Sequence, residues 1–367
     1  MERLSKKLLV DYIGRINVSE YAARRNYLGG STRISEYISR GVISLPQVRE
    51  LILANNSTSE AYKLINELSW REYWHLVWKV RANDIFEYIK PLPFTPRPGL
   101  PTAVLQANTG IKALDSGILQ LMQTGYIDNH MRMWLAGLIC NIAKCDWKTG
   151  ANWMHSYLID GDFASNHLSW QWVAGSYTGK QYLPQQDNIN KYSETKQYDT
   201  YLDKPYDAIA VMEIPPELLE ITTLINFAVN LPKSTIKIED LINESKILLY
   251  SPWTLDPDWL PESNSIRVLL IDTDMYGSNT YSQNVLDSIM WFANEIPRLK
   301  VICDVPQAFA KLHKQIIRKE YPGIANWPGK VEKTKLLYPQ VPEKFYPSFS
   351  SFWKQTLSEQ PTVDTQL

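Results

Sequence analysis

The sequence contains few cysteines and no long apolar run, and both shortages narrow the class of protein. No apolar stretch approaches the roughly 18 residues of a membrane-spanning helix, and the first residues lead into no secretory apolar core. Cys140, Cys145 and Cys303 are an odd number without a spacing pattern. They argue against a disulfide framework and are too few for a four-thiolate iron–sulfur cluster. We therefore expect a cytoplasmic protein in a reducing compartment, with no membrane partner.

The chain also lacks a strong charge of either sign, an internal repeat and a low-complexity tract. The formal net charge is −1, but residues 1–200 carry 22 basic and 18 acidic side chains, against 16 and 21 in the remainder. A basic first half suits a nucleic-acid face, although specialised DNA binders carry a larger excess. A composition that is 44% hydrophobic and 21% charged indicates a folded protein, and 367 residues are enough for two cores.

Aromatic residues are abundant, with 13 Trp and 21 Tyr. Such side chains fill cores, but they also stack on bases and carry electrons, so the count leaves these readings open.

Residues 1 to about 180 have the apolar spacing of helices. Ser31 and Thr32 followed by an apolar-periodic stretch to Gly41 predict a capped helix that ends at a glycine. The proline-rich stretch 91–101 predicts a loop, because proline removes backbone donors. Two further helices are predicted by apolar residues at helical spacing: Ile111, Leu114, Ile118, Leu121 and Met122, and Met131, Trp134, Leu135, Leu138 and Ile142.

The character of the chain changes after residue 187. Residues 187–216 are polar and tyrosine-rich and close with two prolines, which predicts a linker. Strands alternating with helices then predict a small parallel α/β unit, so we divide the chain into domains at 1–200 and 201–367. The expected strands are 247–250, 266–271 and 299–303, and the expected helices are 281–296 and 308–321.

The first candidate functional segment is the stretch 29–35, Gly-Gly-Ser-Thr-Arg-Ile-Ser. Glycines allow close approach of the backbone to a ligand, and hydroxyls and an arginine at a helix start can bind an anion. An ordinary helix cap is the plainer interpretation, because hydroxyl caps are common.

The second segment is 66–75, Asn-Glu-Leu-Ser-Trp-Arg-Glu-Tyr-Trp-His. On a helix, Glu67, Trp70 and Arg71 share one face, which places an acid, a flat aromatic ring and a cation together. Trp74 and Trp78 follow Trp70 at intervals of four residues, and for these two we favour a plain ridge of core side chains.

The third and fourth segments are Asp128–Met133 and Asp160–Trp172. The third is also readable as a polar start to an apolar helix. In the fourth, Asp160 and Asp162 flank a glycine, but no third ligand follows at calcium-loop spacing, so we expect no metal. His155 and His167 are expected to be satisfied by hydrogen bonds.

Taken together and in this order, the four segments resemble the flavin site of the photolyase/cryptochrome family over residues 15–190. The resemblance rests on Asn-Glu-Leu-x-Trp-Arg-Glu, Leu-Ile-Asp-Gly-Asp and Trp-Gln-Trp. It implies a mostly α protein, with an all-helical FAD-binding domain followed by the small α/β domain. The cofactor contacts that it implies are Tyr21, Ser31, Thr32, Arg33, Ile34, Ser35, Arg71, Arg132, Asp160, Gly161, Asp162 and Asn166.

Within this set the resemblance gives each group a role. The stretch 31–35 and Arg71 would lie at the phosphates, and Arg132 and Asp160 would form a charge pair beside the flavin ring. Asp162 would bind the ring edge, and Asn166 would face the ring nitrogen that gains a proton on reduction, which tunes the flavin radical.

The substrate side is implied in the same way. Positions that contact a cyclobutane pyrimidine dimer in the family's repair enzymes correspond to Glu67, Trp70, Asn129, Met133 and Trp172. The histidines that enzymes for the (6-4) photoproduct place near Asn129 and Met133 are absent, which disfavours that lesion. Trp170 and Trp147 match two members of the tryptophan chain that reduces the flavin in light. The outermost member has no clear partner, and Trp134 and Trp153 are unranked candidates.

Three features depart from the family pattern. The N-terminal antenna domain is missing from its usual place, so we expect a short form. Asp128 stands where repair enzymes carry histidine, and His167-Leu168-Ser169 replaces a small glycine-containing turn, which would alter lesion contact. Residues 245–325 resemble the antenna domain only faintly, through Tyr250–Asp258; a permuted or reduced remnant is one interpretation, and we expect no antenna pigment there.

The resulting hypothesis is a photolyase, a lyase in which light-excited reduced FAD donates an electron to a cyclobutane dimer. Its partner would be UV-damaged DNA, better bound as a single strand because extrusion of the lesion then costs less. The protein is taken as a monomer. The alternative is a cryptochrome-like blue-light photoreceptor without repair activity, which signals through the acidic C-terminal half. A flavoprotein reductase or a decayed relative is a third option.

Overall fold

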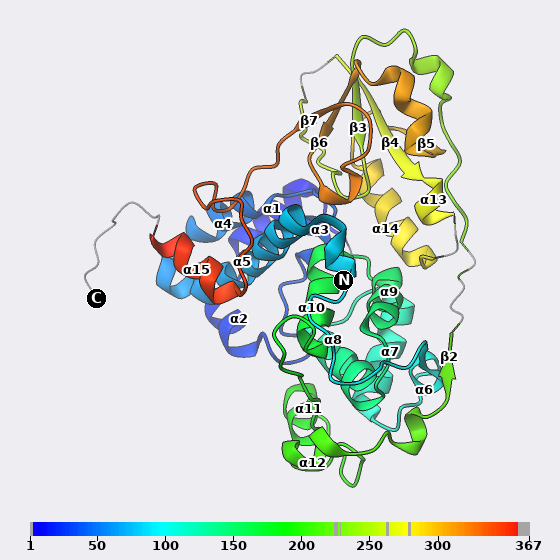
Figure 1. Ribbon diagram of the computed structural model, residues 1–367. Helices are drawn as coiled ribbons and strands as arrows, with labels where there is room; N and C mark the ends of the chain where they lie inside the picture. Colours follow the sequence, from blue (N-terminus) through cyan, green and yellow to red (C-terminus); the bar gives the residue numbers. More distant parts are fainter. Residues whose placement is uncertain (1–2, 224–226, 228, 262–263, 278–279, 359–367) are drawn as a thin grey trace.

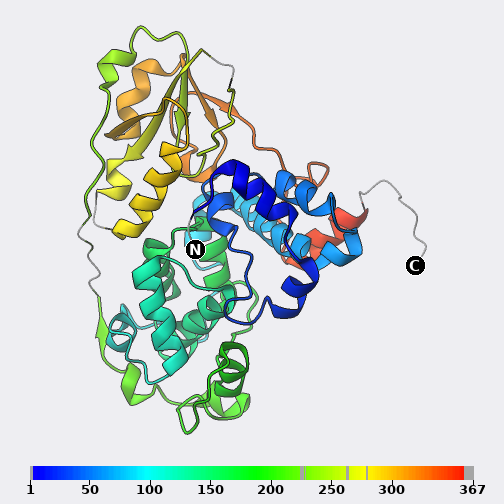
Figure 2. The ribbon, with the colours of Figure 1, turned by 180° about the vertical axis from the view of Figure 1, so that it is seen from behind.

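A helical body and a parallel sheet make up the computed structural model, which describes residues 3–223, 227, 229–261, 264–277 and 280–358. The sheet with its helices lies at one end of the molecule (Figures 1 and 2). Helices α11 (Gln186–Ser193) and α12 (Tyr206–Val211) lie at the opposite end. The predicted fold class, a mostly helical domain followed by a small parallel α/β unit, is confirmed. No helix among these described residues is long and apolar enough to cross a membrane.

The helical body contains the segments that carry the sequence motifs. Its helices are α1 (Lys6–Gly14), α2 (Val18–Arg24), α3 (Ser35–Ser39), α4 (Leu45–Leu53), α5 (Thr58–Arg81), α6 (Thr102–Leu105), α7 (Lys112–Thr124), α8 (Asn129–Gly137), α9 (Trp147–Tyr157), α10 (Phe163–Ala174), α11 (Gln186–Ser193) and α12 (Tyr206–Val211). A π-helical turn, Leu138–Ile142, continues α8, and the short strands β1 (Leu100–Pro101) and β2 (Ile221–Thr222) pair antiparallel.

Helix α5 is the long central element of this body. Ser57 and Glu60 form a capping box at its start, which satisfies backbone donors that a helix otherwise leaves free. Trp78 is 4% exposed and packs on other aromatic rings, which confirms the core-ridge interpretation for this residue. Trp74 is equally buried but also lines a cavity.

Helix α3 starts two or three residues later than a cap at Thr32 or Ser31 predicts. Ser31 and Thr32 do not cap it; the helix begins at Ser35, and the side chain of its cap residue, Ile34, accepts no hydrogen bond from the backbone. Arg33 has a positive φ of 58°, which breaks the helical path before Ser35. The Ser31 hydroxyl is instead within 2.8 Å of the Tyr126 hydroxyl, so a tertiary contact replaces the local cap.

The predicted linker 187–216 is wrong over residues 187–193 and 206–211, because these stretches belong to α11 and α12. Ile189, Leu202 and Ile209 are almost fully buried against the helical body. Their apolar side chains are widely spaced among polar ones, so the local pattern is weak and tertiary packing decides the structure.

The α/β unit is a five-stranded parallel sheet with the order β5-β4-β3-β6-β7. The three predicted strands are confirmed, but the predicted helix 308–321 is wrong. A 3₁₀ segment from Pro306 to Leu312 is followed there by a strand that pairs with β3. Ile316 and Ile317 are β-branched, and so short a run is ambiguous by periodicity alone. The elements are β3 (Ile247–Tyr250), β4 (Ile266–Asp272), α13 (Thr273–Tyr276), α14 (Gln283–Asn294), β5 (Lys300–Asp304), β6 (Ile316–Lys319), β7 (Lys330–Glu332) and the C-terminal α15 (Phe349–Ser358).

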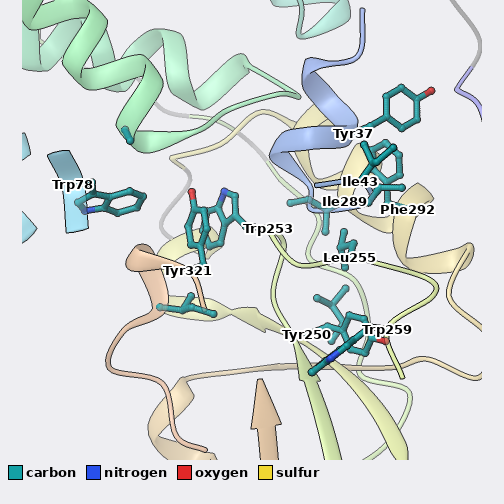
Figure 3. Close-up of a cluster of buried hydrophobic side chains, with 14 of the residues drawn as sticks. Tyr37, Ile43, Trp78, Tyr250, Trp253, Leu255, Trp259, Ile289, Phe292 and Tyr321 are labelled. Carbon is teal, nitrogen blue, oxygen red and sulfur yellow. The ribbon is translucent and has the colours of Figure 1, made fainter. Parts of the chain in front are cut away.

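The carboxyl edge of the sheet packs on the helical body. The Leu255 N–H after β3 donates to the Arg40 carbonyl oxygen at 2.7 Å. Gly41, at φ +71°, allows this approach, because a Cβ there would lie 2.4 Å from the Trp253 carbonyl oxygen. The Trp253 and Tyr321 rings stack with centroids 4.9 Å apart (Figure 3). One buried cluster therefore runs from the first helices into the sheet. The division of the chain into domains at 1–200 and 201–367 remains a prediction.

Glu72 joins α5 to the C-terminal segment and generates a test of the fold. Its carboxylate accepts hydrogen bonds from the backbone N–H groups of Leu337 and Tyr338. Burial outweighs these bonds and raises the pKa of Glu72 from 4.5 to about 7.

We expect Glu72 to make stability fall as the pH rises from about 4.5 to about 7. Between these values the folded protein retains a proton that the unfolded chain has lost, so folding is favoured at the lower pH. Urea unfolding of the wild type and of Glu72→Gln at both ends of this range should show their difference in unfolding free energy change by on the order of 3 kcal/mol. A difference independent of pH would contradict the raised pKa.

Candidate flavin-binding site

Four distant stretches of the sequence meet around a cavity of about 410 Å³. Its walls come from α2, the segment before α3, α5, α8 and α10, and its volume lies in the range of ligand sites. Gly161 and Trp147 are the predicted site residues that do not line it. Those that do are Tyr21, Ser31, Thr32, Arg33, Ile34, Ser35, Glu67, Trp70, Arg71, Asn129, Arg132, Met133, Asp160, Asp162, Asn166, Trp170 and Trp172.

Hydroxyls and one cation gather where the chain enters α3. The Arg33 guanidinium lies 3.5 Å from the centroid of the Tyr126 ring, a cation–π contact. The Tyr12 hydroxyl donates to the Thr32 carbonyl oxygen at 2.9 Å. The Gly29 N–H donates to Asp128 at 2.9 Å, so the acid that departs from the family pattern ties this segment to the start of α8.

Arg132 and Asp160 form an ion pair on the cavity wall. The Arg132 Nη2 donates to both Asp160 oxygens, at 3.0 and 2.9 Å, and its Nε donates to the Ile127 carbonyl oxygen at 2.9 Å. Asp160 is 5% exposed, so the cation compensates a charge that water does not reach. The pair predicted from the sequence is therefore present and fixed in orientation.

Asp162 is the most densely contacted acid of the site. It accepts from the Ser165 N–H at 2.9 Å, which caps α10, and lies 2.8 Å from His75 Nε2 and 3.3 Å from Arg71 Nη2. Burial opposes its ionisation, but Arg71 and His75 outweigh burial and hold the pKa of Asp162 well below its usual range. Tyr321 of the α/β unit donates to the same carboxylate at 3.3 Å.

The predicted lesion residues all line the cavity. Glu67 is paired with Arg25 of the α2 terminus; burial raises the pKa of Glu67 and Arg25 opposes this. The Asn129 amide is 3.7 Å from the Met133 sulfur. Trp70 stacks on Phe349 of α15 with centroids 4.0 Å apart, and Phe349 does not line the cavity.

Other predicted residues are fixed by close contacts. The Asn166 amide donates to the Ala151 carbonyl oxygen at 2.9 Å. His167 contacts Asn152 and the Phe163 carbonyl oxygen, as expected. His155 is satisfied in part: its Nδ1 lies 3.3 Å from the Tyr281 hydroxyl, and its Nε2 has no partner among the described residues. No group of three or more potential metal ligands occurs in the described part of the chain.

Sequence reasoning missed several residues that shape the site. Arg25 follows Tyr21 by one helical turn, a spacing that could have suggested it. Tyr126 and Tyr321 lie outside the motifs and carry no local signal. His75 lies within the second candidate segment, 66–75, but its position in the sequence suggested no role for it.

Comparison with known proteins finds a family that part of this chain matches. Residues 64–203 match the family described as "FAD binding domain of DNA photolyase". This part of the helical body is therefore similar to the FAD-binding domain of that family.

Among curated relatives, the chain is 31% identical over 205 residues to "Deoxyribodipyrimidine photo-lyase" of Buchnera aphidicola subsp. Baizongia pistaciae, which covers 53% of this chain and 41% of that one. It is 27% identical over 191 residues to the protein of the same name in Escherichia coli K12, which covers 49% and 40%. The chain thus spans about two fifths of the length of these relatives.

Among solved structures, a Synechocystis cryptochrome aligns with a TM-score of 0.47 and 22% identity, over 52% of this chain and 44% of that one. A class III photolyase from Agrobacterium tumefaciens aligns with a TM-score of 0.43 and 23% identity, over 51% and 44%.

The ion pair beside the cavity provides a test of the site's electrostatics. We expect Arg132→Met to lower the unfolding free energy by about 3 kcal/mol, because it leaves the buried Asp160 carboxylate unpaired. The double variant Arg132→Met/Asp160→Asn should recover most of the loss, since it removes that charge as well. Urea unfolding at neutral pH measures both; equal stability of the wild type and Arg132→Met would show that the pair does not compensate the buried charge.

Proposed function

We propose that this protein is a DNA repair flavoprotein that uses light to split cyclobutane pyrimidine dimers. The observation that carries the proposal is that the residues implied for flavin binding and those implied for lesion contact line one cavity. Curated relatives named deoxyribodipyrimidine photo-lyase, which match about half of the chain, support it.

The donors of the cavity fit FAD. The hydroxyls of Ser31 and Ser35 and the guanidinium of Arg33 suit phosphates, because they offer donors and a positive charge at one corner. The Arg132–Asp160 pair and Asp162 offer oriented polar atoms for the edge of a flat ring. Bound and reduced, FAD would supply the light-excited electron that opens the dimer.

The chain's own side chains would receive and orient the lesion. Trp70 and Trp172 present indole surfaces to the cavity, and a flipped-out dimer can pack against them. Asn129 offers both donors and an acceptor to the pyrimidine edges. Glu67 can hydrogen-bond the same edges, and Arg25 fixes the direction of its carboxyl group.

We further propose that single strands are preferred, because extrusion of the dimer then breaks fewer stacking and pairing contacts. The excess of basic side chains in residues 1–200 is small, so affinity should be moderate and fall with added salt. We propose that the protein acts as a monomer and without an antenna pigment.

Light-dependent repair is the measurement that tests this function. Purified protein with bound FAD should, after chemical reduction, remove dimers from irradiated oligonucleotides under blue light and not in the dark. Trp70→Ala should weaken lesion binding by about 1–3 kcal/mol, the range for loss of one base-stacking ring. Glu67→Ala should lower the repair rate on the order of 10²-fold, as for loss of a hydrogen-bonding group at the reacting centre.

Tyr206→Ala serves as the control, because this tyrosine is 52% exposed and lies outside the cavity. Flavin content, read from the absorption spectrum, should be unchanged in all variants. A reduced, flavin-loaded protein that leaves dimers intact on both single and double strands would refute repair and leave the photoreceptor alternative.

A further inference from the structure

Trp170 and Trp147 lie on the same side of α9. A Cβ at Gly150 would meet the Trp170 ring at 2.3 Å, so the indole fills the space that this glycine leaves. Gly150 follows Trp147 by three residues on α9, and residues at this spacing are neighbours on one helix face. Trp170 also lines the cavity, whereas Trp147 is fully buried behind it. The two indoles therefore lead from the cavity into the helical body.

Tyr88 contacts the far side of this pair. Its ring is 5.7 Å from that of Trp147, edge to face at 73°. The Tyr88 hydroxyl donates to Asp146 Oδ1 at 2.6 Å, and Asp146 directly precedes Trp147 as the cap of α9. Tyr88 is only half-buried, and Lys148 lies 5.2 Å from its ring centroid. An aromatic ring with a carboxylate partner thus connects Trp147 to the surface.

The other tryptophans considered as the outer member are less well placed. Trp134 is fully buried, stacks on His130 and donates its Nε1–H to Asn188. Trp153 is 2% exposed and contacts Tyr157 at 6.1 Å. In the described part of the chain, the aromatic rings in contact with Trp147 belong to Tyr88 and His167.

We propose that Tyr88 is the outermost electron donor of the chain through Trp147 and Trp170, with Asp146 as its proton acceptor. Trp170 gives one electron to light-excited oxidised flavin, and Trp147 refills Trp170. Tyr88 then gives one electron to oxidised Trp147, its O–H bond breaks, and the proton moves to Asp146. The products are a neutral tyrosyl radical and a carboxylic acid. A solvent thiol returns one electron and Asp146 returns the proton.

The contact between Tyr88 and Asp146 suits this coupling. Burial and the neighbouring carboxylate raise the pKa of Tyr88, so the phenol retains its proton at rest. A one-electron-oxidised phenol is a strong acid, and at 2.6 Å its proton can transfer along the existing hydrogen bond. Partial exposure of Tyr88 gives the thiol access.

The proposal depends on flavin binding but not on DNA repair, so its test uses the oxidised, FAD-loaded protein without DNA. Electron paramagnetic resonance after a blue flash should detect a neutral tyrosyl radical in the wild type. Tyr88→Phe should abolish this signal and slow the accumulation of reduced flavin under continuous light with thiol. Asp146→Asn keeps a side-chain oxygen to cap α9 but removes the base, and should lower the radical yield about tenfold or more.

Tyr157→Phe is the matched control, because Tyr157 makes an edge-to-face contact at 73° with another tryptophan of the same helix. A tyrosyl signal that survives in Tyr88→Phe, or that disappears in Tyr157→Phe instead, would overturn the assignment.

Repair by chemically reduced protein separates this inference from the proposed function. Tyr88→Phe should repair like the wild type once reduced, because the electron chain is then bypassed. A radical at Tyr88 without repair would refute the proposed function alone, and repair without this radical would refute the role of Tyr88 alone. A protein that takes up no flavin would refute both, and its absorption spectrum reveals this before illumination.

Discussion

The buried carboxylate of Asp162 is the constraint on which the site depends. A charge that is 2% exposed is costly unless it is paired and hydrogen-bonded, and here its partners come from three parts of the structure. The α10 backbone, α5 through Arg71 and His75, and the α/β unit through Tyr321 all converge on it. Satisfying this one charge therefore sets the position of two cavity walls and of the sheet relative to them.

The α/β unit takes part in the site through the edge that doubly wound folds ordinarily use for ligands. Ligands of such folds bind beyond the carboxyl ends of the strands. The segments that follow β3 and β6 here pack on the helical body, where the Trp253 ring stacks on Tyr321 (Figure 3). Gly41, after α3, leaves room for the backbone of residue 253. That edge packs on the helical body, so cavity-lining residues such as Leu68 and Trp74 belong to the same buried cluster as the sheet.

Much of the fold and of the candidate site was predictable from local chemistry. The face shared by Glu67, Trp70 and Arg71 follows from helical spacing, and these side chains do line the cavity together. The β-branched runs of β3 and β4 identify strands because they are short, apolar and bounded by turn residues. The start of α3, the helices α11 and α12, and β6 were not predictable, because tertiary contacts outweigh weak local preferences there.

The sequence by itself determined which side chains are candidates for the chemistry, since residue type and spacing along one helix are local properties. It determined the family resemblance for the same reason, through motifs that are each contiguous. Only the tertiary structure decided which residues from separate stretches meet: Arg25 with Glu67, Tyr321 with Asp162, and Tyr88 with Trp147. These contacts join residues far apart in the chain, and packing and the pairing of buried charges, rather than any local pattern, select them.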